Sequence, residues 1–346
     1  MKNTLNFKYL LSLILLSIIT FVSLGCNNGF KKITICEVAH SVFYAPLYAA
    51  IELDYFKEEG IEIELVNGNG ADKVMAALLS KDAQIGLMGP EASLYVYLGG
   101  QENYAINFAQ LTRTDGSFIV SREKIENFTL QDLKGKTILG GRKGGMPEMT
   151  LEYVLKQAGL LVGQDDETVL SQGGVMVRTD VQFAAMAGAF SSGEGDFTTL
   201  FEPTATSLVN SNKGYIVSSV GEFTGEIPYT AFCALKDYIS SNEETIQTIT
   251  NVLYKAQLWV LSSDPSTVAK TIHPHFTSNT LEELTIAMEK YKEINAWSSN
   301  PYFSKLALDN LMKIMIEAKE LNKDVLNQNP YEKIVTTKYA INAMNK

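Results

Sequence analysis

Short apolar runs that read as strands alternate with helix-like segments, and this alternation limits the possible folds more than any other feature. The strand-like runs in the first part are residues 33–36, 61–66, 84–87 and 104–111, and the helix-like segments are 45–58, 71–79 and 91–98. The pattern restarts with strand-like runs 118–120, 136–139, 195–200 and 215–217, and helix-like segments 148–160, 180–191 and 204–209. This order predicts an α/β fold, in which helices cover both faces of a parallel sheet.

Two polar, turn-rich links separate the parts of this pattern, near residues 113–117 and 221–228. We predict that residues 26–113 and 229–346 form a discontinuous first lobe, and that residues 114–228 form a second lobe. The chain beyond residue 242 is nearly all helical in pattern, so the first lobe ends in a helical part. Both links then act as a hinge, and ligands of such folds bind in the crevice beyond the carboxyl ends of the strands.

The stretch 140–150 is the most distinctive segment that follows a strand. Four glycines and Pro147 precede a helix-like segment, so free backbone N–H groups and the helix dipole favour an acceptor-rich ligand group. An empty strand-to-helix turn is the alternative. The candidate binding residues of this stretch are Arg142, Gly144, Gly145 and Met146.

Other candidates follow the remaining strand-like runs. Phe43 and Tyr44 offer a flat apolar wall with one hydroxyl, and Glu91 and Glu202 offer carboxylates. The alternatives are core packing for the two rings and cap or turn roles for the two acids. The apolar stripe of the helix-like segment 180–191 is expected in the core, and it comprises Phe183, Met186, Ala187 and Phe190. The full set of candidates after the strands is Val38, His40, Phe43, Tyr44, Gly89, Glu91 and Glu202.

The N-terminus has the features of a secretory signal. Lys2 and Lys8 precede or flank an apolar run, and small residues follow it before Cys26. Because residues 22–26 resemble a bacterial lipobox, we predict a lipoprotein signal peptide at 1–25 and lipidation of Cys26. A plain transmembrane anchor is the alternative. Both hypotheses place the body of the protein outside the cytoplasm, held at the cell membrane.

Charge and composition exclude several classes of function. The formal net charge of −10 argues against a nucleic-acid partner, because binding to phosphates depends on neutralising them with Lys and Arg. With three histidines and no CxxC or HExxH motif, we predict no metal site. Cys36 and Cys233 lie in strand-like runs; they are either buried free thiols or, if their strands are close, a disulfide.

Several motifs, in order along the chain, resemble the nitrate/sulfonate/thiamine-precursor family of substrate-binding proteins. They are residues 43–48 (FYAPLY), 54–61 (DYFKEEGI), 82–86 (DAQIG), 132–136 (DLKGK) and 193–197 (GEGDF). The resemblance implies a two-lobed periplasmic-binding-protein fold of type II, without a cofactor and expected as a monomer. Such proteins capture a small molecule between the lobes and deliver it to an ABC permease with its ATPase subunits. A sensory role for the same fold stays open.

The resemblance also suggests an enzyme as an alternative function. Pyrimidine-synthesising relatives carry a pyridoxal-phosphate lysine and a substrate histidine after the third strand, where this chain has Met88 and Ala92. Without the amine no Schiff base can form, so we expect no enzyme.

The ligand is expected to be a small nitrogen heterocycle, such as a thiamine-precursor pyrimidine. Glu91 and Glu202 would accept its N–H donors, and in the thiamine-precursor branch a glutamate at the place of Glu202 meets the pyrimidine. The aromatic partner of that branch would fall near Val38, where this chain has no ring. Sulfonate or nitrate-like anions are the alternative, favoured by Arg142.

Overall fold

The computed structural model describes residues 29–346, and residues 32–346 form one compact unit. The predicted signal peptide and Cys26 lie outside the described residues. Within residues 29–346, no helix combines the length and the apolar character needed to cross a membrane.

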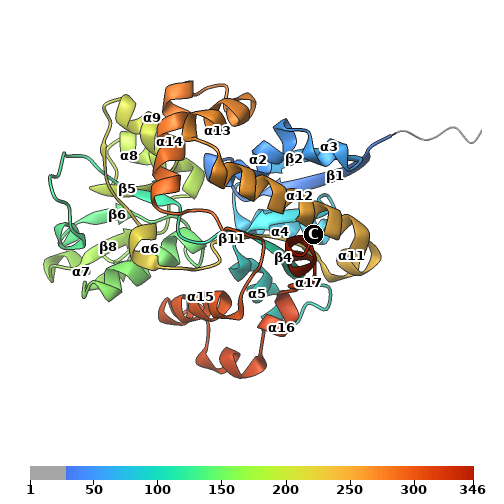
Figure 1. Cartoon of the computed structure of the whole chain (residues 1–346). Coiled ribbons are helices and arrows are strands. Elements are labelled where there is room, and N and C mark those ends of the chain that lie inside the picture. The colour runs from blue at the N-terminus through green and yellow to red at the C-terminus, as the bar shows by residue number, and fades with distance from the viewer. Residues whose placement is uncertain (1–28) are drawn as a thin grey trace, which may run out of the picture. The chain divides into compact units, whose positions relative to one another are not determined.

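Five strands form the first sheet, in the order β2 (Ile61–Asn67), β1 (Lys31–Glu37), β3 (Ile85–Met88), β11 (Thr230–Leu235) and β4 (Ala105–Thr112). β1 and β3 are parallel, whereas β11 runs antiparallel to both β3 and β4. The helices near this sheet in Figure 1 are α2 (Ala45–Glu52), α3 (Tyr55–Glu58), α4 (Ala71–Ser80), α5 (Pro90–Leu98) and α12 (Glu243–Ser262).

Six strands form the second sheet, in the order β10 (Tyr215–Ser219), β5 (Ser117–Ser121), β9 (Phe197–Phe201), β6 (Thr137–Leu139), β8 (Val175–Arg178) and β7 (Val162–Gln164). β6, β7, β8 and β9 are parallel to one another where they pair, and β5 is antiparallel to β9 and β10. Its helices are α6 (Met146–Gln157), α7 (Thr168–Ser171), α8 (Met186–Ser191), α9 (Thr204–Asn210) and α10 (Gly221–Thr224). α6 to α9 lie around the second sheet on the left of Figure 1.

The predicted alternation of strands and helices is confirmed, although β7, α7 and β8 were not predicted and other elements differ in detail. Both sheets are mixed, because β5 and β11, the strands that follow the two links, run against their neighbours. The helix predicted over 45–58 is two helices, since the backbone of Asp54 turns to a φ of 56° between them. The helix predicted over 180–191 is a short 3-10 turn, η3 (Phe183–Ala185), followed by α8.

The two links lie side by side. The Ile227 N–H donates to the Arg113 carbonyl at 2.9 Å, and the Thr114 hydroxyl donates to the Gly221 carbonyl at 2.9 Å. A third connection is made by the residues after α14 (Leu281–Glu293), where the Arg113 N–H donates to the Ala296 carbonyl at 2.9 Å. The chain therefore passes between the two sheets through a narrow, hydrogen-bonded region.

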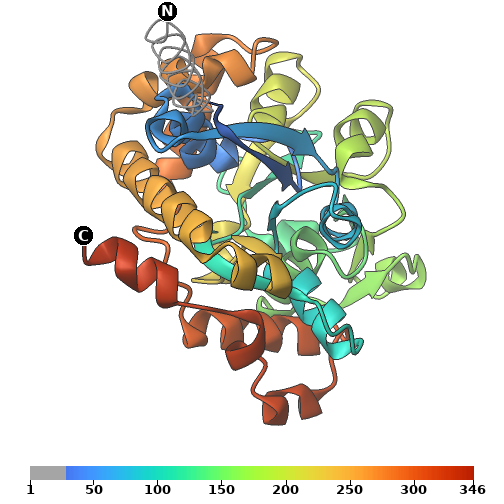
Figure 2. The ribbon, with the colours of Figure 1, turned by 90° about the vertical axis from the view of Figure 1, so that its right-hand side faces the viewer.

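The C-terminal helices pack on elements of both sheets. They are α11 (Lys236–Ser241), α13 (Pro265–Ile272), α14 (Leu281–Glu293), α15 (Lys305–Glu317), α16 (Tyr331–Ile334) and α17 (Lys338–Met344). α14 contacts α9, and α15 contacts α6. α17 contacts α12, and these two are the dark red and gold helices that lie side by side in Figure 2. A capping box of Thr280 and Glu283 fixes the start of α14, and the Asp264 side chain caps α13.

Cys36 and Cys233 flank one glycine. Each pairs in register with Gly86, Cys36 from β1 and Cys233 from β11, so the strand β3 separates them. Both thiols are buried and, in the described part of the chain, free. Of the two alternatives left open by the sequence, the structure shows the free thiols.

Candidate functional site

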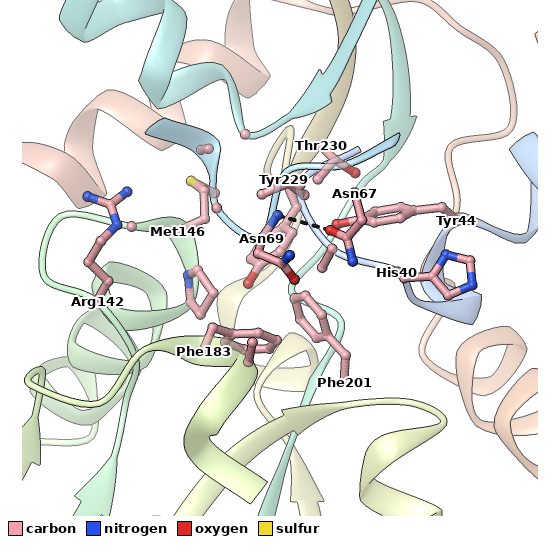
Figure 3. A pocket seen from close by; sticks show the side chains of 18 of the residues that line it. His40, Tyr44, Asn67, Asn69, Arg142, Met146, Phe183, Phe201, Tyr229 and Thr230 are labelled. Carbon is pink, nitrogen blue, oxygen red and sulfur yellow. Dashed lines mark hydrogen bonds between the residues drawn. The ribbon is translucent and has the colours of Figure 1, made fainter. Parts of the chain in front are cut away.

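A cavity of about 290 Å³ lies among the loops that follow the strands of both sheets (Figure 3). The first sheet contributes residues after β1, β2 and β3 and at the start of β11. The second sheet contributes the glycine-rich loop before α6, the segment from η3 to α8, and the end of β9. Eight of the candidate residues line it: Val38, His40, Tyr44, Gly89, Glu91, Arg142, Gly145 and Met146.

Phe43, Gly144 and Glu202 are engaged elsewhere in the structure. The Phe43 ring is fully buried in an aromatic cluster, with its centroid 5.0 Å from that of Tyr291 and 5.4 Å from that of Phe201. Trp297 Nε1 donates to the Phe43 carbonyl at 2.8 Å. Phe43 is therefore core, the alternative that the sequence left open, whereas its neighbour Tyr44 lines the cavity. Both belong to the 3-10 turn η1 (Val42–Tyr44), whose geometry sends adjacent side chains in different directions.

Glu202 is a buried cross-link between segments that are far apart in the chain. Lys290 Nζ lies 2.7 Å from its Oε1, and the Thr206 hydroxyl and N–H donate to its two oxygens at 2.8 and 2.9 Å. Its N–H donates to the Tyr291 hydroxyl at 3.0 Å, and the Ser41 hydroxyl donates to its carbonyl at 2.6 Å. This saturated carboxylate, fully buried and outside the cavity lining, differs from the expectation of a ligand acceptor.

Gly144 anchors the glycine-rich loop rather than lining the cavity. Its N–H donates to Glu148 Oε2 at 3.0 Å, and its carbonyl accepts from the Tyr95 hydroxyl at 3.2 Å. Its φ of 70° is the left-handed region that glycine adopts most readily. Burial, followed by the neighbouring charge of Glu152, raises the pKa of Glu148 to about 8. The loop is thus held by a buried carboxyl group whose pKa lies well above its usual range.

Glu91 is the acidic group of the cavity. It begins α5, its side chain is 2 % exposed, and its Oε2 has no hydrogen-bond partner in the described part of the chain. Burial raises its pKa to about 7, an effect that the N–H groups at the helix start and the charge of Arg142 partly offset. The carboxyl folds back over Gly89: a Cβ at that position would collide with Glu91 Oε2 and come within 2.7 Å of Met146 Cγ.

Arg142 is the basic group of the cavity and lies at its exposed edge. Its Nε is 3.8 Å from Asp72 Oδ1, and both side chains are more than a third exposed. The pair joins the glycine-rich loop of the second sheet to α4 of the first. Asn67, the last residue of β2, and Asn69, two residues later, also line the cavity and lie between Arg142 and His40 in Figure 3.

Aromatic rings from both sheets wall the cavity. Phe183 and Phe201 pack against each other at 4.7 Å between centroids, and Phe201 lies 6.0 Å from Tyr229. Phe183 and Ala187 line the cavity, whereas Met186 and Phe190, from the same predicted stripe, are buried. The assignment of the whole stripe to the core is therefore wrong for Phe183 and Ala187.

His40 closes one side of the cavity. Its Nδ1 is 2.7 Å from Glu37 Oε1, its Nε2 is 2.9 Å from the His275 carbonyl, and its ring stacks on Phe276 at 4.6 Å. The hydrogen bond with the buried Glu37 raises the pKa of His40, against the effect of its own burial. These contacts fix the ring as a wall of the cavity.

Sequence reasoning missed Asn67, Asn69, Phe183, Phe201, Tyr229 and Thr230, which also line the cavity. The same search of residues after strands would have found the two asparagines, because both follow the strand-like run predicted over 61–66. Tyr229 and Thr230 stand at the start of β11, which reaches the cavity only because it is antiparallel. Among residues 29–346 no group of His, Cys, Asp and Glu side chains is arranged to hold a metal ion.

Comparison with known proteins places this geometry in a family. The model of the NMT1-like family matches residues 38–273. A relative named "Putative binding protein YtlA", from Bacillus subtilis (strain 168), is 39% identical over 309 residues, which is 89% of this chain and 89% of the relative.

Solved structures share the fold. The periplasmic nitrate-binding protein NrtA from Synechocystis PCC 6803 has a TM-score of 0.73 at 14% identity, covering 91% of this chain and 89% of that one. The alkanesulfonate-binding protein SsuA from Xanthomonas axonopodis pv. citri, bound to MOPS, has a TM-score of 0.64 at 18% identity, covering 85% and 96%. The predicted periplasmic-binding-protein fold, with two sheets flanked by helices, is confirmed, and so is the family resemblance. The match over most of its length shows that this chain belongs to the NMT1-like family.

Proposed function

We propose that this protein is an extracytoplasmic solute-binding protein of an ABC transporter. It captures a small organic molecule between two lobes, residues 26–113 with 229–346 and residues 114–228, which move about the links 113–117 and 221–228. The proposal rests on the cavity, whose walls come from both sheets, at the carboxyl ends of the parallel strands and the start of the antiparallel β11. A ligand that contacts both walls favours the closed state, which an ABC permease with its ATPase subunits then recognises. The chain acts as a monomer, held at the outer face of the membrane by lipid on Cys26.

The ligand we propose is a small nitrogen heterocycle, such as a thiamine-precursor pyrimidine. The rings of Tyr44, Phe183, Phe201 and Tyr229 suit a planar molecule, and the cavity volume of about 290 Å³ suits a small one. Glu91 and the amides of Asn67 and Asn69 supply polar groups that a heterocycle with several nitrogens can satisfy. Glu202, whose carboxylate is saturated by Lys290 and Thr206, has no part in this proposal.

A sulfonate or nitrate-like anion is the second candidate. Arg142 at the cavity edge favours it, because a guanidinium donates to such anions through parallel N–H groups. Glu91 opposes it, since a second negative charge close to a buried carboxylate is repelled.

The rival enzyme has no support in the site. Met88 and Ala92 are buried in a hydrophobic cluster, and neither side chain can form a Schiff base with pyridoxal phosphate.

A thermal-shift screen tests the proposal. The chain from Asn27 onward is heated with pyrimidines, flavins, sulfonates or nitrate, and a ligand that binds only the native state raises the melting temperature. We expect a shift from at least one pyrimidine. Shifts from the anions alone would refute the heterocycle, and turnover of any compound would refute a pure binding function.

A further inference from the structure

We infer that Glu91 selects the ligand: Oε2 of its carboxyl accepts an N–H from an amino or amidine-like group on the edge of a planar nitrogen heterocycle. The inference deepens the proposed function and rests on it, because it names the chemical group that the cavity requires. It assigns to one side chain the discrimination between a ring that carries an amine and a ring of the same shape that does not.

Most of the other buried carboxylates accept hydrogen bonds through both oxygens, which Glu91 does not. Glu37 binds His40 and Tyr48, one through each oxygen. In Glu148 and Glu202, too, both oxygens accept hydrogen bonds from protein groups. Asp115 likewise accepts from Ser117 and Thr150 through different oxygens.

Two buried carboxyl groups keep an oxygen without a partner in residues 29–346, and only one of them lines the cavity. Glu152 leaves Oε1 unpartnered, but its other oxygen is 2.7 Å from Lys156 Nζ, which supplies a positive charge. Glu91 leaves Oε2 unpartnered and has no side-chain donor in the described chain. A buried acceptor without a donor costs about 1–3 kcal/mol, and more when it is charged, so this oxygen is poised for a donor from outside the chain.

The surroundings of Glu91 orient the expected ligand. Its carboxyl lies over Gly89 and close to Met146, where a loop of the first sheet meets the start of α6. The Tyr44 hydroxyl, on another lining residue, is also buried without a partner in the part of the chain described. A cavity that presents both a carboxylate and a hydroxyl is complementary to a ring with an exocyclic amine and a ring nitrogen, because the amine can donate to the carboxylate and the nitrogen can accept from the hydroxyl.

Arg142 places a positive charge on the side of the cavity opposite Glu91. It is close enough to Glu91 for its charge to act on the carboxyl, yet it belongs to the opposite wall and lies at the exposed edge. A ligand with its donor edge at Glu91 can therefore turn an acceptor-rich substituent toward Arg142. A compact anion cannot use Arg142 without also lying near the carboxylate.

The test compares two probes of one shape, 4-aminopyrimidine and 4-methylpyrimidine, in which a methyl group replaces the amine. Calorimetric titration of the full-length chain in detergent gives both affinities, for the unaltered protein and for Glu91→Gln. Glu64→Gln is the control, because Glu64 is an exposed carboxylate on β2 away from the cavity lining. The ratio of the two affinities is the readout, since a general loss of folding lowers both.

At pH 8, above the pKa of about 7 that burial gives the Glu91 carboxyl, we expect the unaltered protein to prefer the amine by about ten- to a hundred-fold, the value of a hydrogen bond to a charged group. Glu91→Gln should reduce that preference by about ten-fold, because a neutral amide makes a weaker bond, and Glu64→Gln should leave it unchanged. Equal binding of the two rings, or a preference unchanged in Glu91→Gln, would overturn the role of Glu91 and leave the proposed function standing. Binding of a sulfonate with neither ring bound would overturn both.

Discussion

Lys290 Nζ lies 2.7 Å from Glu202 Oε1, and this ion pair ties α14 to the segment that follows β9 in the second sheet. The carboxylate is fully buried while the lysine is a quarter exposed. The same lysine also donates to the Thr206 hydroxyl at 2.9 Å. The pair therefore fixes the back of the cavity, because Glu202 directly follows the wall residue Phe201.

Removal of this lysine should destabilise the protein. In Lys290→Met the buried carboxylate of Glu202 loses its cation, and we expect the free energy of unfolding to fall by about 2 kcal/mol. Urea denaturation measures the change. Lys338→Met is the matched control, because its ion pair with Glu243 is exposed on both sides and should contribute less than about 0.5 kcal/mol. Equal effects of the two substitutions would show that the buried Glu202–Lys290 pair contributes no more to stability than an exposed ion pair.

Glu91 should make stability depend on pH. Its pKa is about 7 in the folded protein and near 4.5 in the unfolded chain, so between these values the folded state binds the extra proton. Stability therefore falls as the pH rises from 4.5 to above 7, and the loss is complete above the folded pKa. Glu91→Gln removes this loss, so it should be more stable than the unaltered protein at pH 8, by on the order of 2 kcal/mol, and nearly equal to it at pH 4.5.

Urea denaturation at several pH values between 4.5 and 8 gives this difference. Taking the difference between the two proteins cancels the titration of Asp115 and Glu148, whose pKa values burial also raises. A difference that stayed constant with pH would contradict the assignment of the titration to Glu91.

Gly89 should be needed for binding for a steric reason. In Gly89→Ala the new Cβ would displace the Glu91 carboxyl and press on Met146, so ligand affinity should fall at least about ten-fold. Calorimetric titration with 4-aminopyrimidine measures the fall. Gly188→Ala in α8 is the control, because a Cβ there meets no atom of the described chain within 4 Å. That substitution should leave binding unchanged and add up to about 1 kcal/mol of stability. Retained affinity in Gly89→Ala would argue against the proposed position of the ligand.

Phe183 and Met186 should separate binding from folding. Phe183→Ala opens a wall of the cavity and is expected to weaken ligand binding about ten-fold with a small change in melting temperature. Met186→Ala leaves a void in the core and should cost about 2–4 kcal/mol of stability. Titration and urea denaturation of both variants give the comparison. Large losses of stability in both variants would show that Phe183 acts mainly as a core residue.

The fold could be predicted from the sequence because strand and helix periods are local signals. The course of β11 could not, since its antiparallel direction depends on where the second link returns the chain. This is why Tyr229 and Thr230 were missed, while Glu91 and Met146 were placed by the rule that ligand groups follow parallel strands.

The rule fails for Glu202. It follows a strand as a ligand residue would, but its partner Lys290 is 88 positions away and shows no local pattern.

The sequence could not show that Phe43 lies in the core while Tyr44 lines the cavity. Both are aromatic and adjacent, but the Phe43 ring packs against Tyr291 and its carbonyl accepts from Trp297, two residues far along the chain whose position no local pattern predicts.

The Asp72–Arg142 pair should be sensitive to the ionic strength of the surrounding solution. It bridges the exposed edge of the cavity, whereas the Glu202–Lys290 pair lies on the buried side. Dissolved ions screen exposed charges over about 8 Å at physiological ionic strength and act far less on buried ones. Added salt should therefore weaken the Asp72–Arg142 contact while the Glu202–Lys290 pair holds, so under the proposed function we expect ligand exchange rates to depend on ionic strength.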